Sequence, residues 1–295
     1  MMKLYRDMDS AELDAQYNAR ATVPESLFLS IMQEYAEQSR RARETLSCTP
    51  DLAYGSHPDE TLDVFRPGPS ASAPRAPVFV YIHGGYWRAL SKNESSSMAP
   101  AYTSAGAVYV AVNYALAPAV TLDTIVDQCR RAVAWVYRNI EQYGGDPDRI
   151  YIGGSSAGGH LCGMLLASGW HTPLGMPLNA VKGALLLSGL YDLAPIPHTH
   201  INAWMKLSAE DAARNSPVNY EPAAGCPIVV SYGDNETDEF KRQSRDYLQQ
   251  WQARGYPGDY VRVPGLNHFD LVLECGKPDS PLARAMLEMM GLTRD

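Results

Sequence analysis

The hydrophobic positions of this chain gather in short continuous runs, with longer amphipathic stretches between them. Most of the runs lack alternating polar positions; they are VFVYI (78–82), AVYVAV (107–112), IYIG (150–153), ALLLS (184–188), IVVSY (228–232) and DYVRV (259–263). Continuous apolar runs of this kind are typical of strands that are covered on both faces. The pattern therefore predicts a central sheet buried between two layers of helices.

One long amphipathic helix is predicted between the second and third runs, and Gly144 and Gly145 end it. Its apolar positions recur at three- and four-residue spacing: Leu122, Ile125, Cys129, Val133, Val136 and Ile140. A helix between two strands forms a crossover, and crossovers join parallel strands. The alternation of strands and helices thus predicts an α/β fold with a mainly parallel sheet and helices on both faces.

The first part of the chain has a different, polar character. Residues 9–46 are compatible with helix, with Asp9 or Ser10 as the N-cap and Glu12 placed to close a capping box with Asp9. We therefore expect a helical N-terminal extension over residues 1–46. A chain of 295 residues with 45% hydrophobic content can bury a sizeable core, and we expect a single domain over 1–295.

The charge of the chain narrows its class of partner. Its net charge is −8, from 33 acidic and 25 basic residues, and no basic run is longer than the two residues Arg40-Arg41. A protein that binds nucleic acid or an anionic membrane usually carries a basic patch or run. The composition therefore favours a small-molecule substrate and excludes nucleic-acid and membrane partners.

Cysteine usage and segment composition predict the compartment. The five cysteines, 48, 129, 162, 226 and 275, are widely spaced and form no CxxC pair, which argues against a disulfide framework and a thiolate metal site. The N-terminal 20 residues have no apolar core typical of a signal peptide, and no apolar run is long enough to span a membrane. We expect a cytoplasmic protein.

A glycine-rich motif follows the third strand. A nucleophilic serine on a tight strand-to-helix turn needs glycine two residues before and two residues after it. In GGSSAGG (153–159), Gly154 and Gly158 meet this need when Ser156 is the centre, whereas Ser155 as the centre would need glycine at position 157 and finds Ala157. Ser156 is therefore the candidate nucleophile.

A second glycine-containing loop follows the first strand and supplies candidate hydrogen-bond donors. The sequence HGGYW (83–87) matches the HGGG-type loop whose backbone N–H groups bind a developing oxyanion. We expect the N–H groups of Gly84, Gly85 and Ala157 to be these donors. His83 is expected to shape the loop rather than to act as the base, because the base of this architecture comes last in the chain.

An acid and then a histidine should follow the serine, each after a strand. The loop after IVVSY carries several carboxylates, and the spacing from Gly233 favours Glu236 over the alternatives Asp234 and Asp238. His268 follows the last strand and is the candidate base. The remaining histidines lack this placement, and His198 and His200 have no further metal-ligand pattern, so we expect neither a metal nor a cofactor.

Together these motifs resemble the α/β-hydrolases of the esterase and lipase type, and within them the kynurenine formamidase (arylformamidase) group. The stretches that carry the likeness are HGGYW (83–87), DNETDEFKRQS (234–244), GLNHFD (265–270), and YDLAPI (191–196) followed by EDAARNSP (210–217). The resemblance covers roughly residues 50–275, so the N-terminal 45 residues add little to it. It implies an α/β-hydrolase fold with a small helical cap insertion at about 192–225, and it matches the family's triad acid to Glu236.

The resemblance implies hydrolysis of N-formylkynurenine to kynurenine and formate, a step of tryptophan catabolism, and a homodimer as a possible assembly. Four aromatic residues, Tyr86, Trp87, Tyr191 and Trp204, are expected to bind a flat aromatic substrate. Because an aryl ester passes through the same intermediate as an aryl formamide, a general short-chain carboxylesterase is the alternative. A non-catalytic hydrolase-like binding protein is a further alternative, against which Ser156 and His268 argue.

Overall fold

The structure is a computed structural model, and it describes residues 3–68 and 75–292. Within these residues a single sheet runs through the molecule, with strand order β1-β2-β4-β3-β5-β6-β7-β8. Its strands are β1 (Ser47–Ala53), β2 (Thr61–Arg66), β3 (Ala76–Ile82), β4 (Val108–Val112), β5 (Gly145–Ser155), β6 (Val181–Leu187), β7 (Ile228–Ser231) and β8 (Gly258–Tyr260). The pairs from β4 to β8 are parallel, while β1 and β2 join antiparallel at one edge. The predicted mainly parallel sheet is confirmed.

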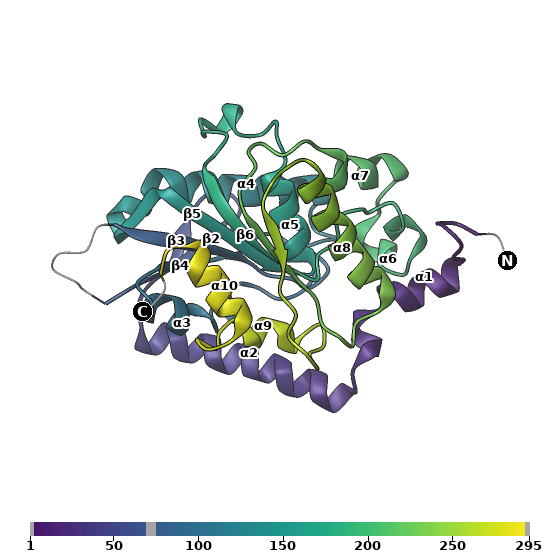
Figure 1. Cartoon of the computed structure of the whole chain (residues 1–295), viewed down its shortest axis with the longest axis horizontal. Coiled ribbons are helices and arrows are strands. Elements are labelled where there is room, and N and C mark those ends of the chain that lie inside the picture. Colours follow the sequence, from purple (N-terminus) through teal and green to yellow (C-terminus); the bar gives the residue numbers. More distant parts are fainter. Residues whose placement is uncertain (1–2, 69–74, 293–295) are drawn as a thin grey trace.

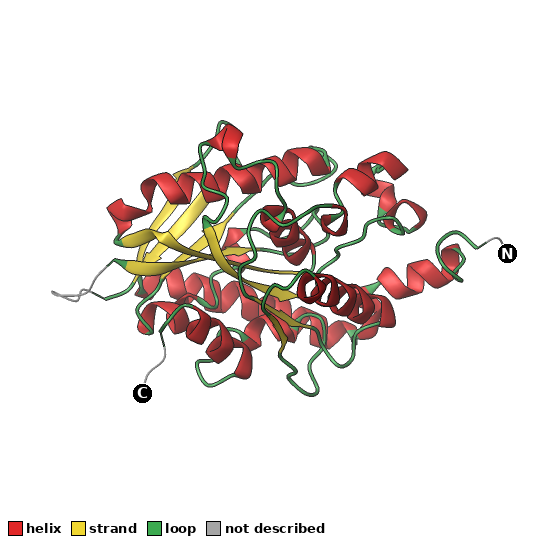
Figure 2. Ribbon diagram, turned by 45° about the horizontal axis from the view of Figure 1, so that its top comes forward, coloured by secondary structure: helices red, strands yellow, loops and turns green. Residues whose placement is uncertain are grey.

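Helices cover both faces of the sheet (Figures 1 and 2). They are α1 (Ser10–Tyr17), α2 (Glu25–Thr45), α3 (Ala99–Ser104), α4 (Leu122–Asn139), α5 (Ala157–Leu166), α6 (Asn202–Met205), α7 (Ala209–Arg214), α8 (Asp238–Ala253), α9 (Asp270–Glu274) and α10 (Pro281–Met289). Short 3₁₀ turns link them: η1 (Ala19–Thr22), η2 (Lys92–Glu94), η3 (Ile140–Tyr143), η4 (Thr172–Leu174), η5 (Ile196–His198) and η6 (Pro217–Asn219). The predicted crossover helix is α4, and Gly144 ends the turn after it with a φ of 81°.

Each buried strand supplies side chains to two separate cores. In β3, Val78 and Val80 belong to the core with α4, α5 and α8, while Phe79 and Tyr81 belong to the core with α2, α3, α9 and α10. Both sets are fully or almost fully buried. Because the two faces are equally apolar, the strand shows no polar alternation along the chain.

The N-terminal segment forms two helices rather than one continuous stretch. α1 begins with the predicted capping box, since the Asp9 side chain accepts from the Glu12 N–H and the Glu12 side chain accepts from the Asp9 N–H. The break lies at Val23, which has extended backbone (φ −132°, ψ 146°) directly before Pro24. Steric contact with the proline ring disfavours helical backbone in the preceding residue. Figure 1 shows α2 lying along the sheet's α9–α10 side.

The two antiparallel strands β1 and β2 were not among the predicted strands. β1 is a half-exposed edge strand that contains Pro50, so it has no apolar run. β2 is interrupted by Asp63, whose side chain is nevertheless fully buried because it accepts from Arg43 Nε (2.9 Å) and Lys92 Nζ (2.7 Å). Because the partners of this buried carboxylate lie far away along the chain, no local pattern of hydrophobic residues predicts the strand.

Candidate active site

Ser156 stands on the turn between β5 and α5 in a strained backbone conformation. Its φ of 57° lies in the left-handed region, with ψ at −118°. The turn is held from both sides, because the Ser156 N–H donates to the Leu187 carbonyl (2.8 Å) and the Ser156 carbonyl accepts from the His160 N–H (3.0 Å). Strain of this kind is typical of functional sites.

The two motif glycines are required because backbone passes close to both. A Cβ at Gly154 would lie 2.4 Å from the Gly158 carbonyl oxygen, and a Cβ at Gly158 would lie 2.0 Å from the Ile82 carbonyl oxygen. Backbone atoms in a packed turn cannot move aside to make room for a Cβ, whereas a flexible side chain could. The spacing seen in the sequence is therefore a steric requirement of the turn that carries Ser156.

The loop after β3 approaches this turn equally closely. A Cβ at Gly84 would lie 2.7 Å from the Ser155 carbonyl oxygen and 3.3 Å from Ser156 Cβ, and Gly85 has a φ of 99°. Both glycines border the same pocket as Ser156. Ala157 is the first residue of α5, where N–H groups have no partner within the helix. The three expected donors thus belong to the two segments that meet at Ser156.

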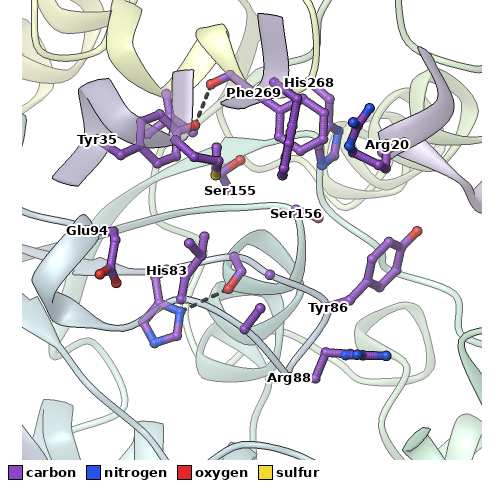
Figure 3. A pocket seen from close by; sticks show the side chains of 18 of the residues that line it. Arg20, Tyr35, His83, Tyr86, Arg88, Glu94, Ser155, Ser156, His268 and Phe269 are labelled. Atoms are coloured by element: carbon purple, nitrogen blue, oxygen red, sulfur yellow. Dashed lines mark hydrogen bonds between the residues drawn. The ribbon is translucent and has the colours of Figure 1, made fainter. Parts of the chain in front are cut away.

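His83 holds the shape of this loop. Its Nδ1 lies 2.9 Å from the Gly84 carbonyl oxygen, as the dashed line in Figure 3 marks, and its ring stacks on Tyr114 with centroids 4.1 Å apart. The Tyr114 hydroxyl donates to the His83 carbonyl (2.8 Å). Burial lowers the pKa of His83 to about 4, so the ring is neutral at pH 7. This is the loop-shaping arrangement that the sequence predicts.

The structure brings one of the three candidate acids to His268. Glu236 Oε2 lies 2.8 Å from His268 Nδ1, and its Oε1 accepts from Ser188 Oγ (2.5 Å) and from the Gly233 N–H (2.5 Å). The Glu236 and His268 side chains are 1% and 5% exposed, so bulk water does not compete for this contact. The other carboxylate hydrogen bonds hold Glu236 in one orientation toward the ring.

The two alternative acids do not contact the imidazole. Asp234 binds Arg262 through both of its carboxylate oxygens and accepts from the Gly265 N–H, and Arg262 lowers the pKa of this carboxyl group. Asp238 is exposed at the first turn of α8. Of the three carboxylates only Glu236 contacts the imidazole.

Ser156 and His268 border one pocket of about 520 Å³ (Figure 3). The His268 ring is packed against Phe240, with centroids 4.6 Å apart. The pocket thus combines a hydroxyl on a tight turn, an imidazole oriented by a buried carboxylate, and backbone N–H groups beside the hydroxyl. This set of groups can carry out acyl transfer through a covalent intermediate.

Of the four aromatic residues that are expected to bind the substrate, two lie at the pocket and two do not. Tyr86 and Trp204 border the pocket, and Trp204 Nε1 donates to the Tyr86 carbonyl (3.2 Å). Trp87 is fully buried and its Nε1 donates to His160 Nδ1 (3.2 Å), away from the pocket. Tyr191 is also fully buried and stacks on Tyr247, with centroids 4.1 Å apart. Both are core residues, because helices cover the segments that carry them.

The sequence pattern did not predict several residues that border the pocket, and many of these residues belong to the N-terminal segment. Phe28, Met32 and Tyr35 of α2 border the pocket, and the Tyr35 hydroxyl donates to the Phe269 carbonyl (2.5 Å). Their spacing of four and three residues is the signal that could have identified them as one helix face. Arg20, Arg88, Phe269 and Val272 are also among the missed residues.

The segment at 192–225, predicted as a cap, consists of short elements, η5, α6, α7 and η6. It borders the pocket through His200 and Trp204. It also contacts the N-terminal segment, because the His200 N–H and Nδ1 both lie near Asp14 Oδ1, at 2.5 and 3.1 Å. Cap and N-terminal segment therefore enclose the pocket together.

Over residues 3–68 and 75–292, no group of three or more His, Cys, Asp or Glu side chains is arranged to hold a metal ion. In the same part of the chain, no helix has both the length and the apolar character that crossing a bilayer requires.

Known proteins resemble this chain in sequence and in fold. Residues 79–271 match a family described by its alpha/beta hydrolase fold. The kynurenine formamidase of Danio rerio is 33% identical, over 98% of this chain and 99% of that protein. Esterase LipQ of Mycobacterium tuberculosis is 30% identical, over 76% of this chain and 58% of that protein. A hyperthermophilic esterase from Pyrobaculum calidifontis has the same fold, with a TM-score of 0.70 at 19% identity over 99% of each chain.

Proposed function

Because this chain belongs to the α/β-hydrolase family and, within it, to the kynurenine formamidases, we propose that it hydrolyses N-formylkynurenine to kynurenine and formate. Membership of these families makes the chain a hydrolase rather than a non-catalytic binding protein. The proposal assigns Ser156 as nucleophile, His268 as general base and acid, and Glu236 as the acid that orients the imidazole. Gly84, Gly85 and Ala157 supply the oxyanion N–H groups.

The substrate assignment depends on how much of the chain is similar to a formamidase. Similarity to the formamidase covers 98% of the chain, whereas similarity to esterase LipQ covers 76%. The N-terminal segment supplies Phe28, Met32 and Tyr35 to the pocket, so it shapes the space in which a substrate is bound. A pocket of about 520 Å³ lined by aromatic and aliphatic side chains suits a single aromatic ring with a side chain.

In the first half of the proposed reaction, His268 accepts the Ser156 hydroxyl proton while Oγ attacks the formyl carbon. The carbonyl oxygen becomes an oxyanion that the loop and α5 N–H groups stabilise, and each such donor contributes roughly 100- to 1,000-fold in rate. Collapse of the tetrahedral intermediate breaks the C–N bond. The protonated His268 gives its proton to the departing aromatic amine, which leaves as kynurenine.

In the second half, water replaces the amine. His268 removes a proton from the water molecule as its oxygen attacks the formyl ester of Ser156. The second intermediate collapses to formate and the free serine, which regains its proton from His268. The buried carboxylate of Glu236, 2.8 Å from His268 Nδ1, stabilises the imidazolium in both halves.

A short-chain carboxylesterase is the alternative function, favoured by the likeness to esterase LipQ. The decisive measurement compares kcat/KM for N-formylkynurenine with kcat/KM for p-nitrophenyl acetate and p-nitrophenyl butyrate. The formamidase proposal expects N-formylkynurenine to be the better substrate. A strong preference for the simple esters would replace it with the esterase function.

We also propose that the protein acts in the cytoplasm. All five cysteines are free, and four of them are buried, which suits a reducing compartment such as the cytoplasm and a role in tryptophan catabolism. A homodimer stays a prediction from the resemblance, and the molar mass in solution would test it.

A further inference from the structure

The charged residues of the pocket are few and unevenly placed. Apart from histidines, its lining carries Arg20, Arg88 and Glu94 among aromatic, aliphatic and small side chains. In Figure 3, Arg20 and Arg88 lie on the side of the pocket where Tyr86 lies, and Glu94 lies on the opposite side. Glu94 already accepts a hydrogen bond from Ser91 Oγ (2.8 Å). One side of the pocket is therefore cationic.

Within the described residues, neither arginine forms an ion pair. The guanidinium of Arg20 lies over the Phe28 ring, 4.4 Å from its centroid, and Arg20 Nη1 donates to the Val23 carbonyl (3.1 Å). The guanidinium of Arg88 lies over the Trp204 ring at 4.2 Å, and among the residues that the structure describes its side chain has no hydrogen-bond acceptor. Both groups are thus oriented by aromatic faces rather than neutralised by carboxylates.

An arginine held in this way is suited to bind a carboxylate. Stacking occupies the face of the guanidinium and leaves its N–H groups, which lie in the plane, free to donate. Two parallel N–H groups match the two oxygens of a carboxylate, and such bonds are stronger than those between neutral groups.

The position of Arg88 relates this cationic side to the reaction centre. The Arg88 N–H donates to the Gly85 carbonyl (3.0 Å), so Arg88 leaves the loop one turn after the expected oxyanion donors. Figure 3 shows Arg88 on the same side of Ser156 as Tyr86. A leaving group that extends to that side from a carbonyl at those donors would bring a charged group at its far end toward Arg88.

We propose that Arg88, assisted by Arg20, binds the carboxylate of the leaving group, so that the pocket selects aryl formamides with an anionic tail over neutral ones. This inference rests on the proposed function, since it identifies the carboxylate with that of the amino-acid side chain of N-formylkynurenine. Arg88 and Arg20 act here as specificity-determining residues and take no part in the chemical steps.

Calorimetric binding to a Ser156→Ala protein tests the inference without turnover. The two probes are kynurenine and 2′-aminoacetophenone, which has the same aminoaryl ketone and no carboxylate. The ratio of their affinities is expected to favour kynurenine, and Arg88→Gln in this background should lower that ratio about tenfold or more. Arg20→Gln should lower it less, because one of its N–H groups already has an acceptor. Arg66→Gln removes an exposed charge of β2 and is the matched control.

Two results would overturn the inference. One is an affinity ratio that Arg88→Gln leaves unchanged, and the other is an equal loss of affinity for both probes, which would mean that Arg88 only supports Trp204. Turnover of N-formylkynurenine by the unsubstituted protein is measured separately. If turnover is absent while the affinity ratio still depends on Arg88, the proposed function fails and the carboxylate site stands. If turnover is present while the ratio does not depend on Arg88, the proposed function stands and the carboxylate site fails.

Discussion

At the scale of single residues, the backbone of Ser156 is the most constrained feature of the site. A serine in this strained region costs about 1–3 kcal/mol, which the surrounding structure must offset. Two backbone hydrogen bonds and the close packing at Gly154 and Gly158 provide that support. The strain holds the hydroxyl out of the sheet, at the pocket, where it can meet a substrate carbonyl.

Ser156→Ala is expected to lower kcat/KM for N-formylkynurenine by at least about 10⁴-fold, because it removes the atom that forms the covalent bond. The substitution removes one oxygen from a turn that is held by backbone atoms, so thermal unfolding should stay close to that of the parent. Steady-state kinetics and a melting curve on the same preparation measure both. A variant with full activity would refute the mechanism.

The three carboxylates after β7 give a matched series. Glu236→Gln should lower kcat by roughly 10⁴-fold, because an amide cannot stabilise the imidazolium and leaves the wrong tautomer of His268 favoured. Asp234→Asn and Asp238→Asn should stay within a few fold of the parent, since neither carboxylate contacts His268. A wild-type rate for Glu236→Gln, together with a large loss in one of the other two variants, would mean that the carboxylate changed in that variant is the triad acid.

At the scale of elements, α2 is an arm of the chain that is fixed at its middle and near its C-terminal end. At its middle, Tyr35 donates to the carbonyl of Phe269, the residue after His268, and near its C-terminal end Arg43 bonds to the buried Asp63 of β2. From its N-terminal half α2 presents an apolar face to the pocket and to the core that it shares with α3, α9 and α10. Substrate binding therefore depends on a helix that lies far from the catalytic groups in sequence.

Tyr35→Phe tests this dependence. Loss of the hydrogen bond to the Phe269 carbonyl should lower the free energy of unfolding by about 1 kcal/mol. It should also raise KM more than it lowers kcat, since α2 borders the substrate and does not touch the reacting atoms. Denaturant unfolding and steady-state kinetics measure the two effects, and Tyr137→Phe on α4, which does not border the pocket, is the control. A pure fall in kcat would instead mean that Tyr35 positions His268.

At the scale of the whole molecule, two buried neutral histidines link stability to pH. Burial lowers the pKa of His83 and of His160 to about 4, from an ordinary value of 6.5. His160 Nε2 lies 2.7 Å from the Asn215 carbonyl oxygen and its Nδ1 accepts from Trp87, an arrangement that needs the neutral ring. Between these pH values the unfolded chain binds protons that the folded chain does not.

The free energy of unfolding should therefore fall by a few kcal/mol as the pH decreases from about 6.5 to about 4. Denaturant unfolding at several pH values measures the slope. Replacing His160 with Gln should make the slope shallower in this window, at some cost in stability at pH 7, whereas His198→Gln, at an exposed position, should leave the slope unchanged. Equal slopes for the His160 variant and the parent would contradict the role given to burial.

The elements that the sequence predicts well are those whose signals are local. The apolar runs mark β3 to β7 because burial on both faces needs only apolar residues in succession, and Gly154 and Gly158 are recognised by their spacing around Ser156, although the backbone that Gly158 must avoid belongs to Ile82 of β3. β2 escapes prediction because Asp63 is stabilised by Arg43 and Lys92, which lie 20 and 29 residues away along the chain.

The order of strand, serine turn, acid loop and histidine loop was thus determined by the sequence alone, because the glycine spacing and the apolar runs that mark these segments extend over only a few residues. Tertiary structure alone decided which carboxylate meets His268, that Trp87 and Tyr191 belong to the core, and that α2 closes the pocket. Those outcomes depend on packing between segments more than 30 residues apart, such as Glu236 with His268 and Tyr35 with Phe269. No local pattern encodes a distance of that kind.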